Sequence, residues 1–280
     1  MVKRVYILLL ALSPIIFATG CNELDFPGMI YSSSGSVESR FAESISWNLS
    51  HESKIKVSPS DTYTMYVGTD CHVDKTYNNL SRFLEEEKND PTSIGSFMLG
   101  DLGQTYDLFP VIAEMLADSY VIVGNHDMYF NRWEEFRQYF GTSTYCITVI
   151  TPKYQDLIIM LDSANGTLGS SQMKWLRNIL LQSRAAYRHC IVCTHVNLFK
   201  TDNSQQFTGN MPIAETFELC ALFDQYDVEI CLQGHDHYRE ELIFKGVEYI
   251  DIESMEDASA PPAYLLLTVG SDITHKFQSL

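Results

Sequence analysis

The chain has 280 residues and a formal net charge of −17 at pH 7. An acidic chain of this kind has no basic stripe that could release counterions from a nucleic-acid backbone, so we do not expect nucleic acid as a partner. The length allows one well-packed domain, and the sequence shows no internal repeat and no second core.

The amino-terminal end has the features of an export signal. Two basic residues precede an apolar stretch at positions 5–18, which is too short to span a bilayer comfortably. Cys21 follows small residues, as at a bacterial lipoprotein cleavage site. We therefore expect residues 1–20 to be a lipoprotein-type signal peptide, and Cys21 to carry a lipid anchor that holds the protein in the cell envelope, outside the cytoplasm. Secretion is the alternative, because Ala18 stands where Leu is commonest.

The segment after the signal is polar. Residues 21–59 are Ser-rich around positions 32–36, and this composition predicts a tether and lead-in segment, of which positions 41–47 could pack on the domain. Residues 60–280 are then expected to form the single folded domain.

Five short apolar runs predict buried strands at positions 63–69, 94–99, 120–123, 189–194 and 228–233. Helical spacing of apolar residues separates them. The predicted helix faces are Leu108, Ile112, Met115 and Leu116; Met173, Leu176, Ile179 and Leu180; and Ile213, Phe217, Cys220 and Ala221. Alternating strands and helices predict an α/β fold, in which ligands bind outside the carboxyl ends of the strands.

A polar cluster follows each predicted strand. The clusters are Asp70-Cys71-His72, Gly100-Asp101, Gly124-Asn125-His126-Asp127, Thr194-His195 and Gly234-His235-Asp236-His237. They hold five of the eight histidines, together with carboxylates and an amide, which divalent Mn, Fe or Zn accepts as ligands. One such cluster alone is usually a turn, but five in this order indicate a metal site. Cys71 and Asp236 lie between ligands and are expected to point away from the metals.

The order and identity of these clusters resemble the calcineurin-like metallophosphoesterase superfamily, over about residues 60–270. The family pattern is Asp-x-His, Gly-Asp, Gly-Asn-His-Asp/Glu, His and Gly-His-x-His. The resemblance implies a four-layer α/β/β/α sandwich of two mixed sheets that binds two divalent ions. It assigns the first ion to Asp70, His72 and His237, the second to Asn125, His195 and His235, and the bridge between them to Asp101.

This division suits phosphoester hydrolysis, because one carboxylate can span two ions ~3.5–4 Å apart, the separation used for in-line displacement at phosphorus. A metal-bridging hydroxide would then attack phosphorus without a protein nucleophile. The resemblance gives His126 the role of donating to the phosphate or protonating the leaving oxygen. We expect hydrolysis of small phosphate mono- or diesters. The alternatives are a non-catalytic envelope lipoprotein that retains a metal site, and a nuclease or pyrophosphatase of the same superfamily.

Two departures from relatives bear on the site. Many members carry Gly-Asp-x-x-Asp, whose second carboxylate orients the catalytic histidine, but here that position is Gln104. Either Asp127 or another acid replaces it, or His126 acts mainly as a hydrogen-bond donor. The segment 100–106 resembles the first motif of purple acid phosphatases, but their second motif is missing between positions 107 and 123. We therefore expect a site without a tyrosinate ligand.

A few residues near the clusters can be interpreted in two ways. Asp162 follows an apolar run and is read as a turn residue, with a place beside the metal ligands as the alternative. Arg132, Arg137 and Arg239 are read as surface residues, with substrate phosphate binding as the alternative. The six cysteines after Cys21 are compatible with disulfides or with buried free thiols.

Overall fold

The computed structural model describes residues 36–74, 76–103, 108–199, 211–257 and 261–280. The predicted signal peptide, Cys21 and Gln104 lie outside these residues. Within them, none of the helices combines the length and the apolar character needed to cross a membrane.

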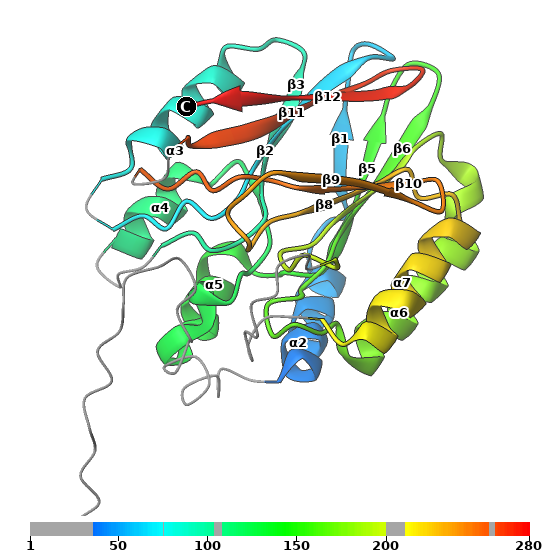
Figure 1. The fold of residues 1–280 in the computed structure, drawn as a ribbon, viewed down its shortest axis with the longest axis horizontal. Helices are drawn as coiled ribbons and strands as arrows, with labels where there is room; N and C mark the ends of the chain where they lie inside the picture. The colour runs from blue at the N-terminus through cyan, green and yellow to red at the C-terminus, as the bar shows by residue number, and fades with distance from the viewer. Residues whose placement is uncertain (1–35, 75, 104–107, 200–210, 258–260) are drawn as a thin grey trace, which may run out of the picture.

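Two mixed sheets form the centre of the molecule (Figure 1). One has seven strands in the order β1-β5-β6-β7-β8-β10-β9, and the other has five in the order β12-β11-β2-β3-β4. The strands are β1 (Lys54–Val57), β2 (Tyr63–Gly68), β3 (Ser93–Met98), β4 (Tyr120–Val121), β5 (Tyr145–Ile150), β6 (Gln155–Met160), β7 (Cys190–Cys193), β8 (Ile230–Gln233), β9 (Glu240–Phe244), β10 (Val247–Asp251), β11 (Ala263–Val269) and β12 (Ile273–Ser279). The α-helices are α2 (Val37–Ser50), α3 (Asn78–Lys88), α4 (Phe109–Met115), α5 (Trp133–Phe140), α6 (Gly169–Ser183) and α7 (Ile213–Gln225), with 3-10 helices η2 (His126–Asn131) and η3 (Arg184–Ala186).

Three apolar layers hold the sheets and helices together. The middle layer lies between the two sheets and includes Val67 and Ile158, which are fully buried. The outer face of the seven-stranded sheet packs on α6 and α7 through residues such as Leu176, and that of the five-stranded sheet packs on α3, α4 and α5 through residues such as Phe83. The four-layer α/β/β/α sandwich is therefore confirmed.

The predicted strands that carry the clusters are β2, β3, β4, β7 and β8. Within the five-stranded sheet β2, β3 and β4 run parallel, and within the other sheet β7 and β8 run parallel. Because parallel strands end at the same edge of a sheet, the polar clusters of each sheet lie together at that edge. β4 is shorter than predicted and ends at Val121.

The predicted face of α7 is wrong except at Cys220, which is buried. Ile213 and Phe217 are 75% and 59% exposed. The residues that α7 buries are Thr216, Leu219, Cys220, Leu222 and Phe223. The helix is apolar over much of its circumference, so its sequence period does not select one stripe, and packing against the sheet decides the buried face.

The folded unit begins before residue 60, so the predicted boundary is corrected to include α2 and β1. β1 pairs in parallel with β5 at the edge of the seven-stranded sheet. On α2 the buried residues are Val37, Arg40 and Ser44. Two of these three are polar, so the buried side of α2 does not form the apolar stripe by which a packed helix is recognised. Among the described cysteines all six are free thiols.

Candidate metal centre

All seven predicted ligands lie together at the carboxyl ends of the cluster-bearing strands. Three groups have donor atoms that lie within 4.8 Å of one another: Asp70, His72 and His237; His72, Asp101 and His126; and Asp101, His195 and His235. Shared members link these groups into one continuous site, and Asn125 joins it through His195. The convergence that the sequence predicted is therefore present.

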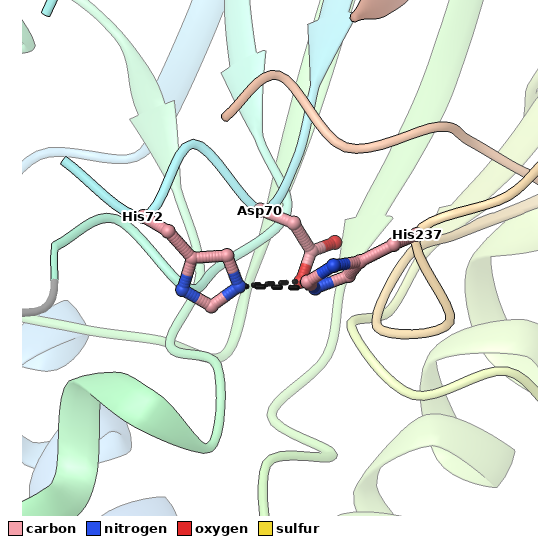
Figure 2. Close-up of side chains that lie close together, drawn as sticks. All are labelled: Asp70, His72 and His237. Atoms are coloured by element: carbon pink, nitrogen blue, oxygen red, sulfur yellow. Dashed lines mark hydrogen bonds and ion pairs between the residues drawn. The ribbon is translucent and has the colours of Figure 1, made fainter. Parts of the chain in front are cut away.

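The first triad is spaced to hold one cation (Figure 2). Nε2 of His72 lies 3.0 Å from Nε2 of His237, and Oδ1 of Asp70 lies 3.6 Å and 3.3 Å from these nitrogens. Ligands at ~2.0–2.1 Å from a tetrahedral ion stand about 3.3–3.4 Å apart. Oδ1 of Asp70 is buried and has no hydrogen-bond partner. A cation would satisfy this oxygen, so these residues fit a divalent metal.

The second group lies on the other side of Asp101. Oδ1 of Asn125 is 3.0 Å from Nε2 of His195, and Oδ2 of Asp101 is 3.4 Å from the same nitrogen. The same Oδ2 is 3.7 Å from Nε2 of His72 in the first triad. The Asp101 carboxylate thus stands between the two groups, and the imidazole of His235 belongs to the second.

Hydrogen bonds fix which atoms of the ligands face the centre. Nδ1 of His195 lies 2.8 Å from the carbonyl oxygen of Leu99, so its proton donates there and Nε2 is left to bind a cation. Oδ2 of Asp70 accepts from the Thr69 hydroxyl at 2.6 Å and from the His235 amide at 2.8 Å. Oδ1 of Asp70 therefore faces the metal position.

The ligands occupy an unusual backbone conformation. Seven described residues other than glycine have positive φ, and five of them are predicted ligands: Asp70, His72, Asp101, His235 and His237. Left-handed backbone costs of order 1–3 kcal/mol at a residue with a side chain. Left-handed backbone is concentrated in the loops that carry the predicted ligands, so the fold tolerates this strain where those side chains converge.

The glycines of the clusters permit close approach of the ligand loops. A Cβ on Gly100, whose φ is +102°, would lie 2.5 Å from the amide nitrogen of Gly124. A Cβ on Gly124 would collide with the Asp101 carboxylate, and one on Gly234 would collide with the Thr69 hydroxyl and lie 2.7 Å from Oδ2 of Asp70. Gly124 and Gly234 are needed because the backbone passes directly against the carboxylates of Asp101 and Asp70, and Gly100 is needed because two backbone segments touch there.

The ionisable groups perturb one another strongly. Burial opposes protonation of His195, but the charge and hydrogen bond of Asp101 and the charge of Asp70 together raise the pKa of His195 to about 10. Burial and the neighbouring His195 lower the pKa of His235 to about 4. The nearby imidazoles hold the pKa of the Asp70 carboxyl well below its usual range despite burial. The buried carboxylates thus favour positive charge in the site, which either protons or metal ions can supply.

His126 borders this centre and is partly exposed. Its side chain is 38% exposed, and its Nε2 is 4.0 Å from Oδ2 of Asp101. Its backbone N–H donates to Oδ1 of Asp101 at 2.8 Å. Its main chain therefore fixes the Asp101 carboxylate, while its ring borders the centre and is partly exposed to solvent.

Asp127 holds the ligand loops together. Its buried carboxylate accepts the backbone N–H groups of Asp101 and Leu102 at 2.8 Å and of Gly124 at 2.9 Å. Burial and the Asp101 charge raise the pKa of Asp127 to about 6. Both oxygens are engaged by the backbone, so this geometry does not support Asp127 as the acid that replaces the carboxylate missing at Gln104.

Residues expected to turn away from the metals have other partners. The Cys71 thiol donates to the carbonyl oxygen of Leu102, and Oδ2 of Asp236 accepts from Asn197 at 3.1 Å. The three arginines near the clusters also have partners. Arg132 is buried and donates to the carbonyl of Gly103, Arg137 pairs with Glu134, and Arg239 pairs with Glu253.

Ser163 is a supporting residue that the sequence did not indicate. Its Oγ accepts from the Thr194 hydroxyl at 2.7 Å and from the backbone N–H groups of His195 and Val196 at 3.1 Å and 2.9 Å. The available signal was its position just after the apolar run at 157–161, because β6 runs parallel to β7 and ends at the same edge of the sheet.

Comparisons with known proteins agree with this geometry. The calcineurin-like phosphoesterase family model matches residues 64–239. A manganese-dependent ADP-ribose/CDP-alcohol diphosphatase of Arabidopsis thaliana is 29% identical over 101 residues, which span 35% of this chain and 29% of that protein.

Solved structures share the fold. A purple acid phosphatase from yellow lupin (Lupinus luteus) has a TM-score of 0.61 at 14% identity, covering 80% of this chain and 53% of that one. The GAP50 anchor of the inner membrane complex of Plasmodium has a TM-score of 0.56 at 11% identity, covering 78% of this chain and 84% of that one. At these identities the likeness concerns the fold.

Proposed function

Because the chain belongs to the calcineurin-like phosphoesterase family, we propose that it is a hydrolase of small phosphate esters that uses two divalent metal ions. Asp70, His72 and His237 would hold the first ion, Asn125, His195 and His235 the second, with Asp101 as the bridge. The position of Asp101 carries the proposal. Its Oδ2 lies 3.7 Å from His72 and 3.4 Å from His195, so one oxygen borders both metal positions.

When bound, the ions would supply an acidified water as the nucleophile and would neutralise charge on the phosphoryl oxygens. The protein's own residues supply the proton donor and hold the loop of Asp101 in place. His126 is the side chain placed to donate a proton to the leaving oxygen or a hydrogen bond to the phosphate, because its half-exposed ring borders Asp101. Asp127 keeps the loops of Asp101 and Gly124 in register so that the bridging carboxylate does not shift.

The experiment is hydrolysis of p-nitrophenyl phosphate and of bis-p-nitrophenyl phosphate by the purified protein with added Mn²⁺. Turnover of either supports the proposal, and the ratio of the rates assigns the ester class. No turnover with two bound ions would favour a non-catalytic protein that keeps a metal site, and the Plasmodium anchor shows that this fold occurs in a protein described by another role.

A diphosphate substrate is the second candidate, favoured by the identity to the Arabidopsis diphosphatase. Two ions beside one bridging carboxylate can neutralise a diphosphate as well as a monoester. ADP-ribose and CDP-choline belong in the same assay for this reason. A nuclease is less favoured, because a net charge of −17 repels long polyanions.

We also infer a location in the bacterial cell envelope through a lipid on Cys21. The support is the short apolar stretch after two basic residues and the small residues before Cys21. Labelling of cells with a fatty-acid analogue should mark the wild-type protein and should fail to mark Cys21→Ser. Equal labelling of both would overturn the anchor and leave the secreted alternative.

A further inference from the structure

Helix α2 lies between α5 and α6 (Figure 1). Its residues make buried polar contacts with two separate segments, one near Asp162 and one near Ser143. Each of these segments is connected in turn to a ligand assigned to the second metal ion.

The first connection runs through a buried ion pair. Nε and Nη2 of Arg40 donate to the two oxygens of Asp162 at 2.7 Å and 2.8 Å, and both side chains are almost fully buried. Asp162 is therefore a charge partner rather than a simple turn residue. The next residue is Ser163, whose Oγ accepts the backbone N–H of the ligand His195 at 3.1 Å.

Further hydrogen bonds hold Asp162 in place beside its ion pair with Arg40. Its backbone N–H donates to Oε1 of Gln172 at 2.9 Å, and its carbonyl accepts from Nε2 of the same side chain at 2.8 Å. The Asp162 carboxylate also accepts the N–H of Ala164 at 3.2 Å. Fixing the carboxylate with Arg40 therefore fixes the 162–164 loop on which Ser163 sits.

The second connection runs through two serines. Oγ of Ser44 on α2 accepts the backbone N–H of Ser143 at 3.2 Å. Oγ of Ser143 accepts the backbone N–H of Val123 at 2.9 Å. Val123 stands two positions before the ligand Asn125, whose Oδ1 is 3.0 Å from Nε2 of His195.

We propose that α2 positions the ligands of the second metal ion, with Arg40 and Ser44 as the positioning residues. The inference rests on the two-metal function proposed above. We expect α2 to affect the second ion alone, because Asp70 of the first triad is held by residues outside α2. Asp70 is held by the Thr69 hydroxyl, the His235 amide and the Ser254 hydroxyl, and these residues lie outside α2.

The test is titration of the metal-free protein with Mn²⁺ by calorimetry, combined with electron paramagnetic resonance of the loaded protein. The variant is Arg40→Met/Asp162→Asn, which removes both charges and keeps an acceptor for Ala164. We expect the first ion to bind as in the wild type and the second to bind about 10–100-fold more weakly, the usual effect of losing support behind a metal ligand. With one equivalent of Mn²⁺ in excess of the two sites, the electron paramagnetic resonance spectrum of the variant should show isolated Mn²⁺ in place of the coupled pair of the wild type.

A matched control separates positioning from general destabilisation. Arg188 and Asp156 form a comparable two-point ion pair at 2.9 Å and 2.5 Å, between the starts of β6 and β7 and away from the metal centre. Arg188→Met/Asp156→Asn should lower the unfolding temperature and leave both Mn²⁺ affinities unchanged. Ser44→Ala should weaken only the second ion, by a smaller factor than the Arg40 variant.

Three results would overturn the proposal: unchanged binding of the second ion in the Arg40 variant, equal weakening of both ions, or the same loss in the Arg188 control. A wild-type protein that binds a single ion would instead defeat the two-metal function itself. The two failures are therefore distinguishable in one experiment.

Discussion

Nε2 of His72 and Nε2 of His237 face each other at 3.0 Å, although the two residues are 165 positions apart in the sequence. Two imidazole nitrogens can share only one proton at this distance, and each presents a lone pair once that proton leaves. Oδ1 of Asp70 lies 3.3 Å from Nε2 of His237, so the three atoms have the spacing of neighbouring ligands around one tetrahedral cation. The relationship means that the fold brings donor atoms from distant parts of the chain to one point.

Removal of His126 should separate catalysis from metal binding. We expect His126→Ala to keep its metal content and to lose about 10²–10⁴-fold in turnover, the usual contribution of a general acid or base. Asp101→Asn should lose metal as well as turnover, because Asp101 borders both metal positions. Elemental analysis and rates on the same samples provide the check. Equal loss of metal in the two variants would contradict the assignment of His126.

Metal removal should destabilise the fold. A ligand present at 100 times its dissociation constant stabilises the folded state by about 2.7 kcal/mol, so thermal unfolding with Mn²⁺ and with chelator should differ by several degrees. His237→Ala should show a reduced difference because it removes a ligand of the first triad. The same unfolding temperature in Mn²⁺ and in chelator would argue that the centre does not bind this ion.

Gly234→Ala should damage the metal centre. A Cβ at this position would collide with the Thr69 hydroxyl and lie 2.7 Å from the Asp70 carboxylate, so Asp70 must shift. We expect at least a tenfold loss of Mn²⁺ affinity, as for other changes behind a metal ligand. Gly246→Ala is the control, since a Cβ there meets nothing within 4 Å although its φ is +82°. The control should cost about 1 kcal/mol of stability and no metal affinity.

Glu38 on α2 should contribute pH-dependent stability. Its carboxylate accepts the hydroxyl and N–H of Ser170 and the N–H of Ser171 at the start of α6, and these hydrogen bonds lower the pKa of Glu38 to about 2. A lowered folded-state pKa adds stability that is present above the usual value near 4.5 and is lost as the pH falls toward 2.

Glu38→Gln should therefore lower the free energy of unfolding at pH 7 by about 0.5–1 kcal/mol, a range suited to a solvent-screened helix-terminus contact. The difference from wild type should shrink in urea titrations between pH 5 and pH 3. Glu218→Gln, at an exposed ion pair with Arg177, serves as the comparison. A Glu38→Gln deficit that stays constant over this range would show that packing, not charge, makes the contribution.

The sequence alone predicted the family and the convergence of the polar clusters. Each cluster follows an apolar run of four to seven residues, and a run of this kind is a local signal of a buried strand. Parallel strands bring their carboxyl ends to one edge of a sheet, so Asp70 and Asp101 had to meet. His195 follows β7 of the other sheet, and it joins them only because the two sheets pack together. The identities of the donor atoms, together with the cluster order, indicated divalent metal ions without any structural information.

The tertiary structure decided what local patterns do not encode. The buried side of α2 includes Arg40 and Ser44, whose burial is favourable only because Asp162 and Ser143 meet them from distant parts of the chain. The buried face of α7 depends on which side of a helix that is apolar over much of its circumference meets the sheet, and Phe217 is left exposed. Periodicity reports the solvent preference of single residues, whereas ion pairs, hydrogen bonds and packing depend on two partners that only the folded chain brings together.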